Sequence, residues 1–181
     1  MLPHHIAVIG SPGSGKTRLA SNLAESLGLA HVELDALFWG PKWTPPEPKA
    51  FLSRTRVAME ADGWVMDGNY SAVRDMVWRE ADTVVWLSYP LRVVLRQLFL
   101  RTVRRIVSGE VLWNDNTETF REQFLSRESL FLYAVRHVIR SRRRFRLLLM
   151  DPRYGHLRKV QLHSPAQERE WMAGIRDQVK R

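Results

Sequence analysis

Residues 10–17 (GSPGSGKT) place glycines, a lysine and a threonine in the spacing G-x-x-x-x-G-K-[ST]. Glycines here let backbone N–H groups curl around a phosphate, and the positive end of the following helix attracts the same anion. Lys16 can contact the β- and γ-phosphates of a nucleoside triphosphate, and the Thr17 hydroxyl can ligate Mg²⁺. A glycine-rich turn with a solvated lysine is the alternative. The residues predicted to bind ATP are Gly10, Ser11, Pro12, Gly13, Ser14, Gly15, Lys16 and Thr17.

Two carboxylates, Asp35 and Asp67, each follow a short apolar segment. A magnesium–nucleotide site needs such a carboxylate to hold the metal or its waters. Gly68 would allow a ligand to approach Asp67 closely, whereas the aromatic residues 38–39 after Asp35 could wall a pocket for an acceptor molecule. Either residue could instead cap the next helix or turn. The spacing leaves open which of the two serves the metal.

The elements that must position these groups alternate between short apolar strands and helices. Strands are expected at residues 6–9, 31–34, 64–66, 83–87 and 160–162, and residues 40–48, with four prolines, form a loop. This alternation predicts an α/β fold with a parallel sheet covered by helices on both faces. Because ligands bind at the carboxyl ends of parallel strands, Gly10, Asp35 and Asp67 should meet at one edge.

The length and composition are those of one globular domain. We expect a single domain over residues 1–181, and 45% apolar residues argue against disorder. The absence of cysteine excludes disulfides, thiolate metal sites and cysteine nucleophiles. Without a basic leader or an apolar stretch long enough to span a membrane, the sequence predicts a cytoplasmic protein.

Arginine supplies most of the positive charge. The formal net charge is +9, only five of the 28 basic residues are lysine, and residues 88–150 hold most of the excess. Planar guanidinium groups suit phosphate, whether it belongs to a nucleotide, a sugar or a nucleic acid.

Four segments together resemble the adenylate-kinase-like branch of the P-loop kinases, and most closely the bacterial group labelled topology modulation or adenylate-kinase-related proteins. These segments are GSPGSGKT (10–17), LDALFW (34–39), WVMDGNYS (64–71) and the arginine-rich stretch after WLSYP (86–90). The resemblance implies a three-layer P-loop NTPase with strand order 2-3-1-4-5 and a small helical lid at about residues 108–122. It also implies ATP and Mg²⁺ as cofactors, Asp67 facing the metal and Asp35 near the acceptor.

The chain departs from the adenylate kinase pattern at two places. The run D-G-F-P-R, whose arginine binds the acceptor nucleotide, is replaced by Asp67-Gly68-Asn69-Tyr70-Ser71. Arg54, Arg56 and Arg74 are the candidate substitutes, and AMP is a doubtful acceptor. The closer group has a lid arginine where this chain has Thr117, so Arg121 would have to take that role.

A long helix is expected after Pro90, and its arginines divide between two arcs. At 100° per residue, Arg92 and Arg96 project into the middle of the apolar arc, and Arg101 lies on the polar arc. A buried arginine needs an acidic partner or a charged ligand unless its guanidinium reaches solvent, so spacing leaves Arg96 open. The family resemblance favours Arg96 and Arg101 as residues that neutralise the transferred phosphoryl group.

The sequence therefore predicts an ATP-dependent phosphotransferase with an unidentified small-molecule or nucleotide acceptor. Two alternatives remain: a nucleic-acid-binding NTPase that affects DNA topology through its arginine-rich region 92–146, and a nucleotide-sensing NTPase. A solvated helix face is the simplest reading of the arginines at 136–146.

Overall fold

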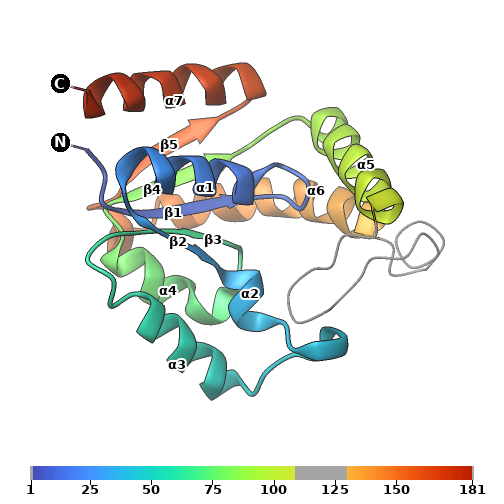
Figure 1. Ribbon diagram of the computed structural model, residues 1–181, viewed down its shortest axis with the longest axis horizontal. Coiled ribbons are helices and arrows are strands. Elements are labelled where there is room, and N and C mark those ends of the chain that lie inside the picture. Colours follow the sequence, from blue (N-terminus) through green and yellow to red (C-terminus); the bar gives the residue numbers. More distant parts are fainter. Residues whose placement is uncertain (1, 109–129, 181) are drawn as a thin grey trace.

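The structure is a computed structural model that describes residues 2–108 and 130–180. Its parallel strands form one sheet in the order β2-β3-β1-β4-β5 (Figure 1), which confirms the predicted order. Val8 of the central strand lies beside Asp67 on one side and Val85 on the other. The strands are β1 His5–Gly10, β2 Ala30–Glu33, β3 Trp64–Asp67, β4 Thr83–Leu87 and β5 Arg158–Leu162.

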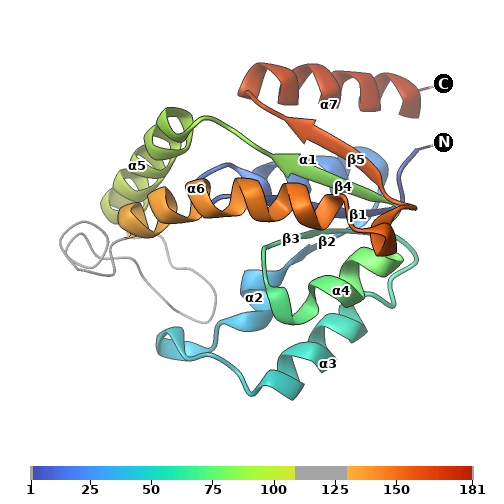
Figure 2. The same ribbon diagram turned by 180° about the vertical axis from the view of Figure 1, so that it is seen from behind.

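Helices cover both faces of the sheet, as Figures 1 and 2 show from opposite sides. Ile6 and Val8 pack toward α1 and α7, while Ala7 and Ile9 pack toward α4 and α6. This alternation along one apolar strand is expected of a parallel sheet buried on both faces. The helices are α1 Lys16–Leu27, α2 Leu34–Phe38, α3 Pro48–Ala58, α4 Ser71–Glu80, α5 Leu91–Ser108, α6 Leu130–Leu149 and α7 Pro165–Val179. The short 3₁₀ turns are η1 Pro41–Trp43 and η4 Pro152–Tyr154.

The second strand ends earlier than the sequence predicts. It stops at Glu33, and Leu34 begins the short helix α2, a helix that the sequence analysis did not predict. Leu34 is buried against Gly68, where a Cβ atom would lie 2.8 Å from the Leu34 Cβ. Asp35 therefore lies in the first turn of a helix and not at the end of a strand.

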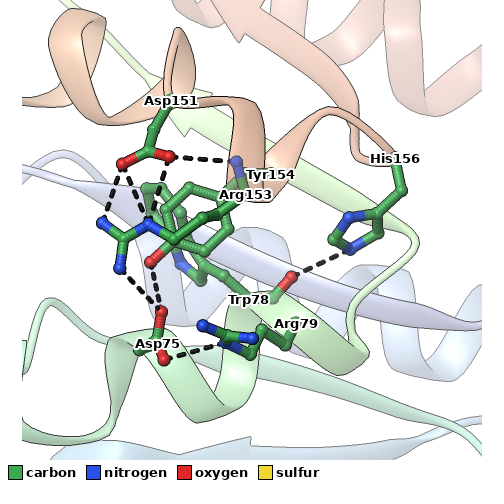
Figure 3. Close-up of polar contacts among 7 residues, drawn as sticks. All are labelled: Asp75, Trp78, Arg79, Asp151, Arg153, Tyr154 and His156. Carbon is green, nitrogen blue, oxygen red and sulfur yellow. Dashed lines mark hydrogen bonds and ion pairs between the residues drawn. The ribbon is translucent and has the colours of Figure 1, made fainter.

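Hydrogen bonds and ion pairs, drawn in Figure 3, connect the segment between α6 and β5 to α4. The Arg153 guanidinium pairs with Asp151 at 2.7 Å and with Asp75 at 3.5 Å, and the Tyr154 hydroxyl donates to Asp75 over 2.9 Å. Hydrogen bonds from Arg153 lower the pKa of Asp151 to about 2. The ring of Tyr154 also packs edge-on against Trp78 of α4.

Helix α7 is tied to α1 by a buried carboxylate. Glu168 accepts hydrogen bonds from Arg18 over 2.8 Å and from the hydroxyl of Tyr89. Across the described part of the chain, no helix combines the length and the apolarity needed to cross a membrane.

Candidate active site

The loop between β1 and α1 has the geometry that the glycine pattern predicts. Gly13 and Gly15 adopt φ angles of +79° and +89°, which side chains disfavour. Gly13 also touches α5: a Cβ there would lie 2.8 Å from the Cβ of Leu98. Helix α1 begins at Lys16, and its first turn has no side-chain cap among the described residues. The amides of that turn are available to an anion.

Lys16 is half-buried in this loop, and its ammonium donates to the carbonyl of Ser11 over 3.3 Å. Burial lowers the pKa of Lys16, the carboxylates of Asp35 and Asp67 oppose that shift, and the charge of Arg101 adds to it. Three further predicted site residues, Asp35, Asp67 and Arg101, therefore lie within electrostatic range of Lys16. A phosphate anion there would offset the cost of burying the ammonium.

Asp67 lies at the end of β3 with both carboxylate oxygens engaged. Oδ2 accepts a hydrogen bond from the Thr17 hydroxyl over 2.8 Å, and Oδ1 is 3.0 Å from Nε2 of His31. The carboxylate is buried, and its hydrogen bond raises the pKa of His31. Sequence reasoning missed His31, because its place beside Asp67 depends on the register of β2 against β3.

Asn69 holds the start of the phosphate loop. Its Nδ2 donates to the carbonyl of Gly10 over 2.5 Å, and its Oδ1 accepts from the Gly10 amide over 3.3 Å. The side chain therefore satisfies both backbone groups of the residue where β1 ends. The sequence pattern predicted no role for Asn69 beyond its place in the motif DGNYS.

Asp35 faces an aromatic wall. The hydroxyl of Tyr70 donates to Oδ1 of Asp35 over 2.5 Å, and the Tyr70 ring lies 4.5 Å from Phe38 and 5.1 Å from Phe51, between centroids. The aromatic residues after Asp35 thus pack with Tyr70 and Phe51, and their role as the wall of an acceptor pocket stays a prediction. Tyr70 is a further residue of this wall that the sequence analysis did not single out.

The two arginines that were predicted to act from α5 differ in their exposure to solvent. Arg101 is half-buried and close enough to Lys16 to influence its pKa, whereas Arg96 is exposed. The expectation that Arg92 and Arg96 lie within the buried face of α5 was wrong, because both are exposed. The buried residues of this helix are Val94, Leu98 and Thr102, and Val94 and Leu98 pack near the loop. This rotation brings Arg101 inward and turns Arg96 outward.

The donors around Thr17 fit a magnesium–nucleotide pair. The Thr17 hydroxyl and the Asp67 carboxylate are hard oxygen donors, which Mg²⁺ prefers. Within residues 2–108 and 130–180, no cluster of three or more His, Cys, Asp or Glu side chains could hold a metal. The buried Ser14 hydroxyl also lacks a hydrogen-bond partner among these residues. The phosphate oxygens of a nucleotide would complete the coordination of a metal at Thr17 and Asp67, and would accept a hydrogen bond from Ser14.

Solved structures share this fold. A shikimate kinase from Acinetobacter baumannii in complex with shikimate has a TM-score of 0.52 and 16% identity, covering 99% of this chain and 94% of that chain. A gluconokinase from Sinorhizobium meliloti has a TM-score of 0.52 and 20% identity, covering 99% and 95%. A sugar kinase from Janibacter has a TM-score of 0.50 and 17% identity, covering 96% and 94%.

The chain has the fold of the P-loop kinases. At these identities the likeness shows the fold alone. No protein-family model and no curated protein matches the chain.

Proposed function

We propose that this chain is an ATP- and Mg²⁺-dependent phosphotransferase with a small-molecule or nucleotide acceptor. The observation that carries the proposal is the Thr17–Asp67 hydrogen bond at the base of the phosphate loop. The half-buried Lys16 ammonium of the same loop has no ion-pair partner among the described residues. Only an anion of high charge density matches this combination of backbone amides, ammonium and dipole.

The phosphate donor would bind along residues 10–17. Loop amides and the N-terminus of α1 would hold the β-phosphate, and Lys16 would bridge toward the γ-phosphate. Mg²⁺, held by the Thr17 hydroxyl and by Asp67 directly or through water, would supply charge neutralisation on the phosphates. Asn69 and His31 would keep the loop and the carboxylate in place.

The acceptor would bind beside Asp35. An alcohol in this position can lose its proton to the carboxylate as the phosphoryl group arrives. Arg101, whose charge influences Lys16, is the stronger candidate to neutralise the transferred group. Arg96 would need a different side-chain conformation, because its side chain is exposed.

The test is ADP release with Mg²⁺ and a panel of nucleoside monophosphates, sugars and small alcohols. Stimulation by at least one acceptor is expected in the wild type and in Lys180→Ala, an exposed lysine far along the chain, but not in Lys16→Ala. ATP hydrolysis that no acceptor accelerates would instead favour a nucleotide-sensing NTPase. An absence of magnesium-dependent nucleotide binding would refute both functions.

Several finer expectations stay predictions. The single-domain assignment is one of them. The lid at residues 108–122, with Thr117 and Arg121, lies outside the described residues apart from Ser108. Membership of the topology modulation group also rests on the sequence resemblance alone.

Nucleic-acid binding is the second candidate, supported by exposed arginines along α6 at positions 140, 143, 144 and 146. Binding through a solvated basic face would weaken steeply with salt, and each arginine would contribute similarly.

A further inference from the structure

The short connection between β4 and α5 contains a buried tyrosine that two other helices bind. Tyr89 is 1% exposed and lies in residues 88–90, which join the strand to the helix (Figure 2). Its hydroxyl donates to Glu168 of α7, and its carbonyl accepts a hydrogen bond from Arg142 of α6 over 2.8 Å. The start of α5 is therefore held from two sides.

Glu168 connects this tyrosine to the helix that follows the phosphate loop. Its Oε1 accepts a hydrogen bond from Arg18, in the first turn of α1, and its Oε2 accepts from the Tyr89 hydroxyl. Burial, together with the hydrogen bond to Glu168, raises the pKa of Tyr89, so the hydroxyl stays protonated and remains the donor. Because Glu168 itself lies in the first turn of α7, one carboxylate joins the starts of α1, α5 and α7.

A buried carboxylate is a costly way to hold helices together. The desolvation of a buried ion pair often outweighs its attraction, and apolar residues of similar size can stabilise a core as well or better. Glu168 is not needed to cap α7, because the Ser164 hydroxyl already accepts from the amide of Gln167 over 3.2 Å. What the carboxylate adds is direction, since each of its oxygens receives one donor at a defined place. This arrangement indicates a positioning role.

Helix α5 in turn packs against the phosphate loop. The close approach of Val94 and Leu98 leaves no room for a side chain at Gly13, and both residues are fully buried there. Arg101 follows less than one turn after Leu98 on the same helix. A change in the direction of α5 at Tyr89 would therefore move the residues that contact Gly13 and would move Arg101 with them.

We propose that Glu168 is a positioning residue that, through Tyr89 and Arg18, fixes the placement of α5 against the phosphate loop. The carboxylate holds the start of α5 relative to α1, and the contact between Leu98 and Gly13 holds the helix about two turns later. As a statement about phosphoryl transfer by way of Arg101, the inference rests on the proposed phosphotransferase function. As a statement about the placement of α5, it stands independently of that function.

The first test measures the placement of α5 without using catalysis. The chain contains no cysteine, so Ser21→Cys on α1 and Leu100→Cys on α5, both at exposed positions, provide two unique sites for nitroxide spin labels. Double electron–electron resonance then reports the distribution of distances between the two helices. Tyr89→Phe, which removes one hydroxyl, and Glu168→Leu, which removes the carboxylate, should each shift or broaden this distribution.

Tyr154→Phe is the matched control. Tyr154 is another buried tyrosine whose hydroxyl donates to a carboxylate, that of Asp75 over 2.9 Å, but this bond leads to α4 and not to α5. Its loss should lower the stability of the fold and leave the distance distribution unchanged. An equal change in Tyr154→Phe and Tyr89→Phe would overturn the proposal, since that result describes a general loosening of the fold.

Glu168→Gln tests rescue by a conservative change. A carboxamide can accept from Arg18 and donate to the Tyr89 oxygen, so this variant should keep a distribution close to that of wild type. Thermal unfolding identifies any variant that has lost its fold, and Tyr89→Phe carries the test if Glu168→Leu does not fold. A distribution that Tyr89→Phe leaves unchanged would overturn the proposal.

The second test concerns phosphoryl transfer. In the ADP-release panel, Tyr89→Phe should lower kcat about tenfold relative to Tyr154→Phe, because a small displacement of a catalytic group costs at least that much. The KM for ATP should change less, since Asn69 holds the start of the phosphate loop without contacting α5. Equal kcat values in the two tyrosine variants would overturn the role in catalysis. If no acceptor stimulates ADP release in the wild type, the proposed function has failed, and the distance measurement still decides whether Glu168 fixes α5.

Discussion

Thr17 and Asp67 lie 50 positions apart in the sequence, yet the hydroxyl of one donates to the carboxylate of the other over 2.8 Å. The bond joins the first turn of α1, directly after the phosphate loop, to the end of β3. It unites the two oxygen donors that the sequence singles out for magnesium.

Replacing Thr17 with valine should abolish the magnesium dependence of nucleotide binding. The variant loses a metal donor and leaves Asp67 with one hydrogen bond fewer, so the affinity for ADP with Mg²⁺ should fall about tenfold or more. Thr17→Ser keeps the hydroxyl and should bind nearly as wild type does. Calorimetry with and without EDTA measures the effect, and equal magnesium dependence in Thr17→Val and wild type would contradict the assignment.

Removing the imidazole of His31 should destabilise the fold and loosen Asp67. A buried carboxylate oxygen that loses its partner costs about 1–3 kcal/mol. We therefore expect His31→Phe to unfold at lower urea concentration, whereas His31→Gln, which keeps an N–H donor, should be milder. Identical midpoints for the phenylalanine and glutamine variants would argue against the hydrogen bond as the cause.

Alanine at Gly13 should be poorly tolerated. Its Cβ would lie 2.8 Å from Leu98 and 3.1 Å from the carbonyl of Val94, at a φ of +79°. Strain and overpacking together should lower the free energy of unfolding by about 2–4 kcal/mol. Gly174→Ala is the control: nothing lies within 4 Å of its Cβ position, and a helical alanine should stabilise α7 by about 0.5–1 kcal/mol. Thermal unfolding of both variants decides the matter, and equal changes would refute the packing argument.

The Asp151–Arg153 pair should give stability with a defined pH dependence. Hydrogen bonds from Arg153 lower the pKa of folded Asp151 from 3.8 to about 2. The contribution is therefore complete above about pH 4 and disappears as the pH falls toward 2. Urea unfolding should place Asp151→Asn below wild type at neutral pH, and the difference should shrink through the acid range. Asp177→Asn, whose carboxylate has no ion pair within the described residues, controls for the change in net charge. A gap that stays constant with pH would contradict the prediction.

The sequence predicted the sheet and the phosphate loop because both depend on local patterns. Apolar runs mark the strands, and GSPGSGKT carries its own geometry. The orientation of α5 could not be predicted, because its buried stripe follows contacts with Gly13 that hydrophobic spacing does not reveal. The contacts of His31 and Asn69 depend on strand register, where a shift of one residue reverses the side-chain face.

The double hydrogen bond between Asn69 and Gly10 has one more consequence. In the register of β1 against β3, the last paired residues are Val8 and Asp67, so Gly10 lies beyond the reach of β3 as a strand. The amide of Asn69 imitates the peptide group that another rung of the ladder would have offered, with one donor and one acceptor. The chain after Asp67 can therefore leave the sheet and turn toward Tyr70 and α4, while the backbone N–H and carbonyl of Gly10 keep their hydrogen bonds. Aspartate, which only accepts, and leucine, which neither donates nor accepts, would each fail to replace both hydrogen bonds.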